Sequence, residues 1–283
     1  MTQSLIGKAA VVTGGGNGIG RGVALELARQ GAKVVVADIG KAADGTLVAD
    51  KVVAEIVKAG GVAVPNYDNV ATIQGGENII GTAVKNFGTI DILVTCAANF
   101  KRCSIVEMSE ENWNSIIDVH LRGHFNCCKF AAAEMIKQKK GRIITFASRA
   151  AAGGGGSAAY SSAKAGILGL TSALSSELQP HGITVNAIMP SADTQLFPGK
   201  RPAGAGTDGF PASLNLDPEC IAPVVAYLAT DGAQCITGRY IYASGGDICV
   251  YARPLELHGA AFLRKPGKWA VEELSEVLPP LAR

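Results

Sequence analysis

Short runs of apolar residues alternate along the chain with longer segments in which apolar residues recur at helical spacing. The short runs predict strands at residues 8–13, 33–38, 62–67, 90–95, 142–147, 183–188 and 239–243. The longer segments predict helices near residues 18–30, 44–59, 72–87, 110–139, 158–179 and 217–231. Strands that read as continuous apolar runs are typical of parallel sheets covered on both faces. The alternation therefore predicts an α/β fold of the Rossmann type: a doubly wound, seven-stranded parallel sheet with helices on both faces, in a single domain.

Two segments depart from this alternation. Residues 196–216 are rich in Gly, Pro and Ala, which predicts an irregular loop, and its apolar side chains suit a lid that excludes water from a bound substrate. Residues 248–283 follow the last predicted strand and are expected to form an extension, packed on the same domain or on a neighbouring subunit. The predicted dinucleotide-binding catalytic domain spans residues 1–247.

Composition and charge narrow the function classes. Of the 283 residues, 48% are hydrophobic and 18% are charged, which excludes a disordered chain. The net charge of +2 implies no strong field, so no nucleic-acid partner is expected. No apolar run is long enough to span a membrane, so no membrane partner is expected. The 7 cysteines show no CxxC pair and no zinc spacing, and the N-terminal residues show no secretory pattern. We therefore expect a cytoplasmic protein without a metal.

A glycine-rich segment lies between the first predicted strand and the first predicted helix. Residues 13–20 read Thr-Gly-Gly-Gly-Asn-Gly-Ile-Gly. Glycines here let the backbone approach a pyrophosphate, and the N-terminus of the helix offers N–H groups and positive potential. Asp38 ends the second predicted strand, where its carboxylate can accept the ribose hydroxyls and repel a 2′-phosphate. Because Ile39 and Gly40 follow it, the sequence favours NAD over NADP.

Three residues near the middle of the chain suit proton transfer to or from an alcohol. Tyr160 and Lys164 are four residues apart on a predicted helix, so they share one face. A free phenol has a pKa of about 10, which a nearby ammonium lowers. Ser148 follows the fifth predicted strand, and its hydroxyl can hold the substrate oxygen while Tyr160 exchanges the proton. An isolated pair at this spacing is more often a buried tyrosine beside a lysine that reaches the surface, and the glycine-rich segment is what favours the catalytic interpretation here.

With the glycine spacing of residues 13–20 and Tyr160-Ser-Ser-Ala-Lys164, the chain resembles the short-chain dehydrogenase/reductase family over about residues 5–247. The resemblance implies that Ser148, Tyr160 and Lys164 are catalytic, that Lys164 also binds the nicotinamide ribose, and that the protein forms a homodimer or homotetramer. Asn186 is a further matching position. The cofactor-binding positions implied are Gly14, Asn17, Gly18, Ile19, Gly20, Asp38, Asp68, Asn69, Ala97, Tyr160, Lys164 and Thr194.

Three positions depart from the family's pattern. Residues 95–98 read Thr-Cys-Ala-Ala where members often carry Asn-Asn-Ala-Gly. His120 aligns with the asparagine whose backbone carbonyl holds a water leading to the lysine, so His120 is either a proton-relay position or a packing residue. We expect the nearby His124 to pack in the protein interior. Pro190-Ser191 replaces the usual Pro-Gly, and Thr194 is the expected partner of the nicotinamide carboxamide.

Only the family resemblance and the composition of two loops limit the candidate substrates. The sequence around His120 resembles the branch with (R)-3-hydroxyacyl-CoA dehydrogenase domains of multifunctional enzymes and bacterial relatives acting on steroid side chains. Arg149, Lys200 and Arg201 either face the phosphates of a CoA thioester or are solvated loop charges. Residues 150–159 have few large side chains, which leaves room for a bulky substrate. A free alicyclic, steroid or aryl alcohol, dehydration or epimerisation with tightly held NAD, and a non-catalytic NAD-binding subunit are the alternatives.

Overall fold

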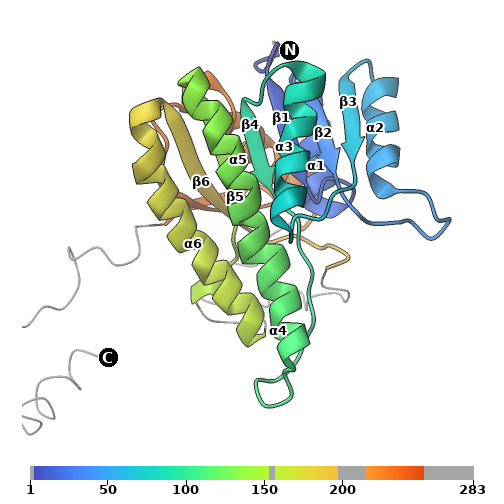
Figure 1. The fold of residues 1–283 in the computed structure, drawn as a ribbon, viewed down its shortest axis with the longest axis vertical. Coiled ribbons are helices and arrows are strands. Elements are labelled where there is room, and N and C mark those ends of the chain that lie inside the picture. The colour runs from blue at the N-terminus through green and yellow to red at the C-terminus, as the bar shows by residue number, and fades with distance from the viewer. Residues whose placement is uncertain (1–2, 153–156, 197–214, 252–283) are drawn as a thin grey trace, which may run out of the picture. The chain divides into compact units, whose positions relative to one another are not determined.

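One twisted sheet runs through the computed structural model, which describes residues 3–152, 157–196 and 215–251 (Figure 1). The strand order is β3-β2-β1-β4-β5-β6-β7-β8, and the first seven of these are parallel to their neighbours. The bounds are β1 Ala9–Thr13, β2 Lys33–Ala37, β3 Val62–Asn66, β4 Ile92–Thr95, β5 Gly141–Phe146, β6 Ile183–Pro190, β7 Tyr240–Ser244 and β8 Asp247–Val250. The order reverses direction between β1 and β4, which is where α/β sheets of this kind bind ligands.

Helices cover both faces of the sheet. On one face lie α1 (Gly18–Arg29), α2 (Val48–Lys58) and α7 (Ala222–Leu228), which pack in one apolar cluster with alternate strand residues such as Val12. The other face carries α3 (Ile73–Phe87) and α5 (Gly123–Gln138), which pack with the intervening residues such as Val11, and Figure 1 shows α6 (Ala158–Leu178) beside α5. Because successive strand residues point to opposite faces, a strand buried on both faces must be apolar throughout.

The sheet has eight strands rather than the predicted seven. The additional strand, β8, is antiparallel to β7 and pairs Ser244 with Asp247 across a two-residue turn, Gly245-Gly246. Two glycines between strand segments are a hairpin signal. This hairpin begins within the predicted catalytic domain, and β8 crosses the predicted boundary at residue 247 into the expected extension. The remaining residues of that expected extension, 252–283, lie outside the described residues, as do most of the expected lid (197–214) and residues 153–156 of the glycine-rich loop.

The segment predicted as one helix over residues 110–139 is interrupted. Helix α4 (Glu110–Ile117) passes into a π-helical segment, Asp118–Arg122, before α5 begins at Gly123. A π-helical turn inside an α-helix is rare and is frequently found at functional sites. Here it contains His120, which is fully buried. Among the described residues, no helix is both long enough and apolar enough to cross a bilayer.

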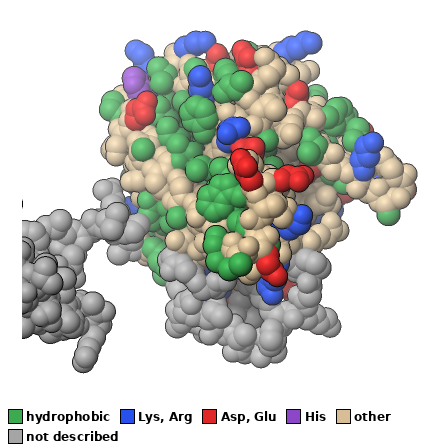
Figure 2. All heavy atoms as spheres, turned by 60° about the horizontal axis from the view of Figure 1, so that its bottom comes forward, with side chains coloured by type: hydrophobic (Ala, Val, Ile, Leu, Met, Phe, Trp, Pro, Cys, Tyr) green, Lys and Arg blue, Asp and Glu red, His purple; other side chains and the backbone are tan. Residues whose placement is uncertain are grey.

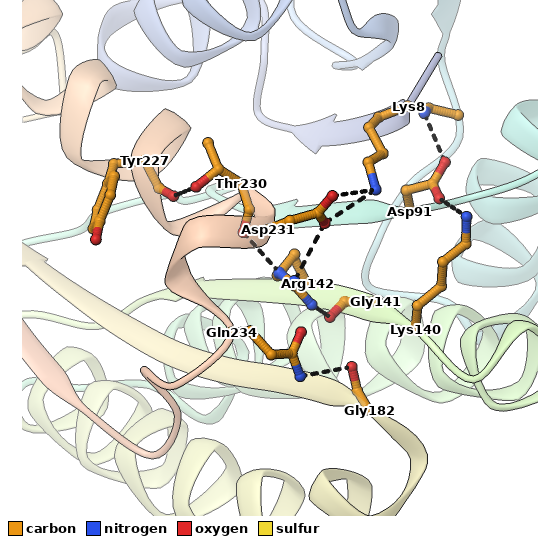
Figure 3. Close-up of polar contacts among 11 residues, drawn as sticks. Lys8, Asp91, Lys140, Gly141, Arg142, Gly182, Tyr227, Thr230, Asp231 and Gln234 are labelled. Carbon is orange, nitrogen blue, oxygen red and sulfur yellow. Dashed lines mark hydrogen bonds and ion pairs between the residues drawn. The ribbon is translucent and has the colours of Figure 1, made fainter. Parts of the chain in front are cut away.

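An ion-pair network lies at the amino-terminal ends of β1, β4 and β5 (Figure 3). The carboxylate of Asp231 contacts Lys8 at 3.2 Å and Arg142 at 3.5 Å. The nearly buried Asp91 accepts a hydrogen bond from the Ala9 backbone N–H at 2.9 Å and pairs with Lys140 at 3.3 Å. These contacts link the chain segments at the amino-terminal edge of the sheet. The predicted site residues lie at the opposite, carboxyl-terminal edge.

Candidate active site

The glycine-rich loop joins the end of β1 to the first turn of α1. Gly14 and Gly18 have positive φ angles of 65° and 50°, which L side chains rarely adopt. A Cβ atom on Gly20 would lie 2.0 Å from the carbonyl oxygen of Gly14, so no side chain fits there. Asn17 is the N-cap residue of α1, and Ile19 follows in its first turn. The loop therefore presents backbone to a ligand at a helix N-terminus, as phosphate binding requires.

Two predicted contacts of the cofactor lie beside this loop. The Thr13 hydroxyl oxygen accepts hydrogen bonds from the backbone N–H groups of Cys96 and Ala97, which follow β4. A Cβ atom on Gly18 would lie 3.4 Å from the methyl carbon of Thr194, which follows β6. The ends of β1, β4 and β6 thus converge on the glycine-rich loop.

The Asp38 carboxylate closes the other side of the loop. Its Oδ2 accepts a hydrogen bond from the Gly16 N–H at 2.9 Å, and its Oδ1 accepts one from the Gly40 N–H at 2.8 Å. Each carboxylate oxygen has a second lone pair available to a ribose hydroxyl. The position of Asp38 is therefore compatible with the predicted contact to a ribose, and the choice of NAD over NADP stays a prediction.

Asp68 and Asn69 follow β3, at the next strand end along the sheet. The Asp68 carboxylate accepts hydrogen bonds from the side-chain amides of Asn66 and Asn78, both at 2.8 Å. Asn69 accepts a hydrogen bond from the Ala71 N–H, which shapes the turn before α3. Both residues thus belong to well-bonded turns at the carboxyl edge of the sheet, and their roles at an adenine stay predictions.

Tyr160 and Lys164 lie together in the first two turns of α6. Ser157 caps this helix by accepting a hydrogen bond from the Tyr160 N–H. Both side chains are buried, 5% and 3% exposed respectively, and the Lys164 Nζ lies 5.6 Å from the centroid of the Tyr160 ring. The same Nζ donates a hydrogen bond to the Phe146 carbonyl oxygen at 2.6 Å. Burial lowers the pKa of Lys164 from 10.5 to about 8.

Ser148 lies two residues beyond Phe146, the end of β5. Its side chain is half-buried, and its hydroxyl accepts a hydrogen bond from the Ala150 N–H at 3.2 Å. Because Lys164 is bonded to the carbonyl of Phe146, the same strand end positions both the serine and the lysine. This arrangement brings the predicted catalytic residues to the strand ends that also carry the glycine-rich loop and Ala97.

His120 packs against Tyr160 of the predicted catalytic pair. Its ring is nearly perpendicular to that of Tyr160, with 5.2 Å between the centroids, and its Nε2 lies 2.7 Å from the Asn99 carbonyl oxygen. Burial, reinforced by the charge of Lys164, lowers the pKa of His120 to about 3, so the ring is neutral. The structure therefore places His120 at the site predicted from its alignment, while its part in a proton relay stays a prediction.

Sequence reasoning missed two neighbours of the predicted catalytic pair, Tyr160 and Lys164. The Phe100 ring meets Tyr160 edge-on, with 5.3 Å between the centroids. His124 is buried as expected, but burial and the charge of Lys164 lower its pKa well below the usual range, which places it in the same electrostatic environment. Its spacing of four residues from His120 on a helical pattern was the available signal.

The remaining residues named from the sequence either make structural contacts or lie outside the described residues. The Arg149 guanidinium lies over the ring of the buried Tyr242, 5.3 Å from its centroid. The Asn186 side chain donates a hydrogen bond to the Ile236 carbonyl and accepts one from the Arg239 N–H, which connects β6 to the segment before β7. Lys200 and Arg201 lie outside the described residues.

Comparison with models of known protein families shows to which family the chain belongs. The family model described as short chain dehydrogenase matches residues 8–202. The chain belongs to the short-chain dehydrogenase family. The resemblance stated from the glycine loop and the Tyr160–Lys164 spacing is thereby confirmed, and the chain is an oxidoreductase of a family that uses nicotinamide cofactors.

Several curated proteins are similar over most of the chain. A short-chain type dehydrogenase/reductase of Mycobacterium tuberculosis is 40% identical, over 83% of this chain and 81% of that protein. The peroxisomal multifunctional enzyme type 2 of Drosophila melanogaster is 41% identical over 85% of this chain, but the match spans only 39% of that longer enzyme. A 3-oxoacyl-[acyl-carrier-protein] reductase of Synechocystis is 38% identical, over 86% of this chain and 98% of that protein.

A solved structure shares the fold. The crystal structure of a short chain dehydrogenase from Mycobacterium avium superimposes with a TM-score of 0.86 at 36% sequence identity, covering 99% of this chain and 96% of that one. The predicted Rossmann-type α/β fold is therefore confirmed, with the strand count corrected as described above.

Proposed function

We propose that this protein is an NAD-dependent dehydrogenase that interconverts a secondary alcohol and a ketone, with Tyr160 as the general acid and base. The observation that carries the proposal is the buried pairing of Tyr160 with Lys164, whose Nζ lies 5.6 Å from the Tyr160 ring centroid. The pair lies at the strand ends that also form the glycine-rich loop. A tyrosine and a lysine buried only for packing would not require that neighbourhood.

The described residues have distinct tasks in this reaction. A bound nicotinamide cofactor supplies hydride chemistry, because it accepts or donates a hydride at the carbinol carbon. Ser148 holds the substrate oxygen by a hydrogen bond, and Tyr160 takes the hydroxyl proton during oxidation or returns it during reduction. Lys164, when charged, stabilises the phenolate of Tyr160 and so makes the phenol a usable base near neutral pH.

The cofactor proposed is NAD rather than NADP. A 2′-phosphate would meet the carboxylate of Asp38, which is held in place by the N–H groups of Gly16 and Gly40. We expect Asp38→Ala to shift the ratio of kcat/KM for NAD over that for NADP toward NADP by about tenfold or more, since it removes one charge-assisted contact and one repulsion.

The control for this measurement is Asp44→Ala. Asp44 precedes α2, and its exposed carboxylate pairs with Lys51 in that helix. This substitution should leave the cofactor ratio unchanged. Equal use of NAD and NADP by the unsubstituted protein would contradict the assignment of Asp38.

The substrate proposed is a 3-hydroxyacyl-CoA. Support comes from the similarity to a domain-sized part of the multifunctional enzyme, and the reductase relative acts on a related acyl chain held by a carrier protein. A free alicyclic, steroid or aryl alcohol is the second candidate, favoured by the apolar cluster of Phe100, Met108 and Trp113 packed around Tyr160.

Initial rates of NADH formation distinguish these substrates. The panel contains 3-hydroxyacyl-CoA thioesters, the same acyl chains without CoA, and cyclic or aryl secondary alcohols. The proposal predicts a higher kcat/KM for the CoA thioester than for its matched free alcohol, and a loss of that advantage in the double variant Lys200→Ala and Arg201→Ala. Binding of NADH without turnover of any alcohol would instead indicate a non-catalytic subunit.

Assembly and location are also proposals. Helix α5 exposes the apolar side chains of Phe125 and Ile136, which supports pairing between copies of the chain as a homodimer or homotetramer. Light scattering of the purified protein tests this, and a monomer at micromolar concentration would contradict it. We propose a cytoplasmic location on the basis of the N-terminal residues and the cysteine pattern, which fractionation of cells would test.

A further inference from the structure

Two rings from the chain between β4 and α5 contact the ring of Tyr160. The Phe100 ring meets it at 89°, with 5.3 Å between the centroids, and the His120 ring meets it at 85°, with 5.2 Å between the centroids. Both arrangements are favourable edge-on aromatic pairs. Tyr160 is 5% exposed and His120 is fully buried, whereas Phe100 is only partly buried. Phe100 is therefore the ring of the three that borders the solvent most.

Asn99, the residue before Phe100, is bonded through both its backbone and its side chain. Its backbone nitrogen and oxygen lie 3.2 and 2.7 Å from Nε2 of His120. Its side-chain amide donates hydrogen bonds to the carbonyl oxygen of Ser115 at 3.1 Å and to the hydroxyl of Ser115 at 3.0 Å. These contacts join the segment after β4 to α4 and to the π-helical segment. The backbone that carries the Phe100 ring is therefore held in place.

The side chains packed around the predicted catalytic tyrosine differ in size according to the segment that supplies them. The segment after β5 and the first turn of α6 supply Ala150 and Ala159. The segment after β4 and helix α4 supply Phe100, Met108 and Trp113, each of which is only partly buried. The bulk beside the tyrosine therefore comes from the segment after β4, and part of its apolar surface is open to a ligand.

The position of the reacting oxygen limits where a substrate can lie. That oxygen must come within about 2.6–3.2 Å of the Tyr160 hydroxyl to exchange a proton. The carbinol carbon is bonded to this oxygen, so its two substituents extend over the residues packed around Tyr160. Apolar groups of ligands are bound mainly by hydrophobic and aromatic side chains. A substituent near the alanines has room, whereas a substituent on the side of Phe100 meets a large ring.

We propose that Phe100 is a specificity-determining residue whose ring limits the width of one substituent on the carbinol carbon. An unbranched alkyl chain lies along this ring, whereas a cyclohexyl or phenyl group on the same carbon collides with it. Because the backbone at Asn99 is held by His120 and Ser115, the ring cannot move aside at low cost. The inference rests on the function proposed above, and it assigns the site to secondary alcohols that carry one unbranched apolar chain.

Two matched pairs of alcohols test this inference on the unsubstituted protein. 3-Hydroxynonanoyl-CoA carries a hexyl group on the carbinol carbon, and 3-cyclohexyl-3-hydroxypropanoyl-CoA carries a cyclohexyl group with the same number of carbons. 2-Octanol and 1-cyclohexylethanol form the corresponding pair without CoA. We expect kcat/KM with NAD to be about tenfold or more higher for the hexyl member of whichever pair is oxidised. Equal values for the two members would overturn the inference.

Substitution of Phe100 should change this ratio. Phe100→Ala removes the ring, so we expect the hexyl-to-cyclohexyl ratio of kcat/KM to fall by about tenfold or more, and Phe100→Leu should give an intermediate ratio. General damage to the fold would lower both values together and leave their ratio unchanged. Tyr227→Ala, at an exposed aromatic residue of α7, is the matched control and should not alter the ratio. An unchanged ratio in Phe100→Ala would overturn the proposal.

A binding measurement separates this inference from the proposed activity. Calorimetry gives the Kd of each corresponding ketone in the presence of saturating NAD, which is an unreactive complex because the oxidised cofactor has no hydride to donate. The hexyl ketone should bind about tenfold or more tightly than its cyclohexyl partner, and Phe100→Ala should reduce the difference. Equal Kd values would overturn the role of Phe100 and leave the dehydrogenase proposal intact. Turnover of no alcohol would contradict the dehydrogenase proposal, and binding of no ketone would overturn both.

Discussion

Lys164 holds an amine inside the protein, where water can no longer stabilise its charge. Burial lowers the pKa of this amine to about 8, and its hydrogen bond to the Phe146 carbonyl is the interaction that fixes its place under the Tyr160 ring. A lysine that is charged at neutral pH but only weakly hydrated interacts strongly with a nearby phenolate. The burial that lowers the pKa of Lys164 therefore also reduces the stability of the fold.

That cost should appear in the pH dependence of stability. Between pH 8 and pH 10.5 the unfolded chain binds a proton at this lysine that the folded protein does not, so folding stability rises with pH across that window. Over that range we expect the free energy of unfolding of the protein with Lys164 to rise by about 3 kcal/mol relative to that of its Lys164→Met variant.

Urea unfolding at several pH values measures this difference. Both proteins are compared in a Tyr160→Phe background, so that ionisation of the phenol does not contribute. A stability difference that stays constant between pH 7 and pH 10.5 would contradict a lowered pKa at Lys164.

Residue types and spacing predicted that Tyr160, Lys164 and Ser148 lie close together, but not which other side chains surround them. The four-residue spacing follows from helix geometry, and Ser148 follows from its place after a buried strand. The contacts of Phe100 and His124 with this site depend on how the segment after β4 and the π-helical segment fold back, which no local pattern encodes. Long-range packing of this kind is outside the reach of a single sequence.

At the scale of elements, the loop between β1 and α1 is the most constrained part of the site. A Cβ atom on Gly20 would lie 2.0 Å from the Gly14 carbonyl oxygen, which is backbone and cannot move aside without shifting the loop. We therefore expect Gly20→Ala to abolish NADH binding, measured by quenching of protein fluorescence or by calorimetry.

The matched control is Gly81→Ala, on the exposed side of α3. A Cβ atom there meets nothing within 4 Å, so the substitution should leave NADH binding intact and stabilise the helix by about 0.5–1 kcal/mol. Unaltered NADH affinity in Gly20→Ala would show that the loop does not receive the cofactor.

Elements were predicted best where one pattern dominates. Each of the seven parallel strands was anticipated within about two residues. The central strands are buried on both faces, which favours nearly unbroken apolar runs. Strand β8 was missed because Asp247–Val250 is short and its two exposed residues, Ile248 and Val250, are apolar, so the segment lacks an alternation of polar and apolar residues. The π-helical segment was missed because its extra residue alters the register of a helix without altering the residue types.

At the scale of the whole molecule, the two edges of the sheet have different tasks. The carboxyl edge collects the glycine-rich loop, Asp38 and the predicted catalytic pair. Figure 2 turns the bottom of Figure 1 forward and shows hydrophobic side chains interspersed with charged ones on the face in view. The amino edge carries the ion-pair network of Asp91 and Asp231 (Figure 3). Separation of this kind lets the site vary while the opposite edge maintains the fold.

The amino edge should therefore matter for stability and not for turnover. Asp91→Ala leaves the buried N–H of Ala9 without its acceptor, which should destabilise the protein by about 1–3 kcal/mol. Asp91→Asn keeps an acceptor there and loses only the pair with the half-exposed Lys140, for which we expect about 0–1 kcal/mol. Chemical denaturation measures both, and equal losses in the two variants would contradict the assigned role of the N–H group.

The central claim is that Tyr160 moves the proton while hydride passes to or from the nicotinamide. Single-turnover NADH formation, followed by stopped-flow absorbance in the unsubstituted protein and in Tyr160→Phe, tests it most directly. The account predicts unchanged NADH affinity and a rate lower by about 10²–10⁴ in Tyr160→Phe, the range that a positioned general base contributes. A rate within about tenfold of the unsubstituted protein, at equal NADH affinity, would contradict the account.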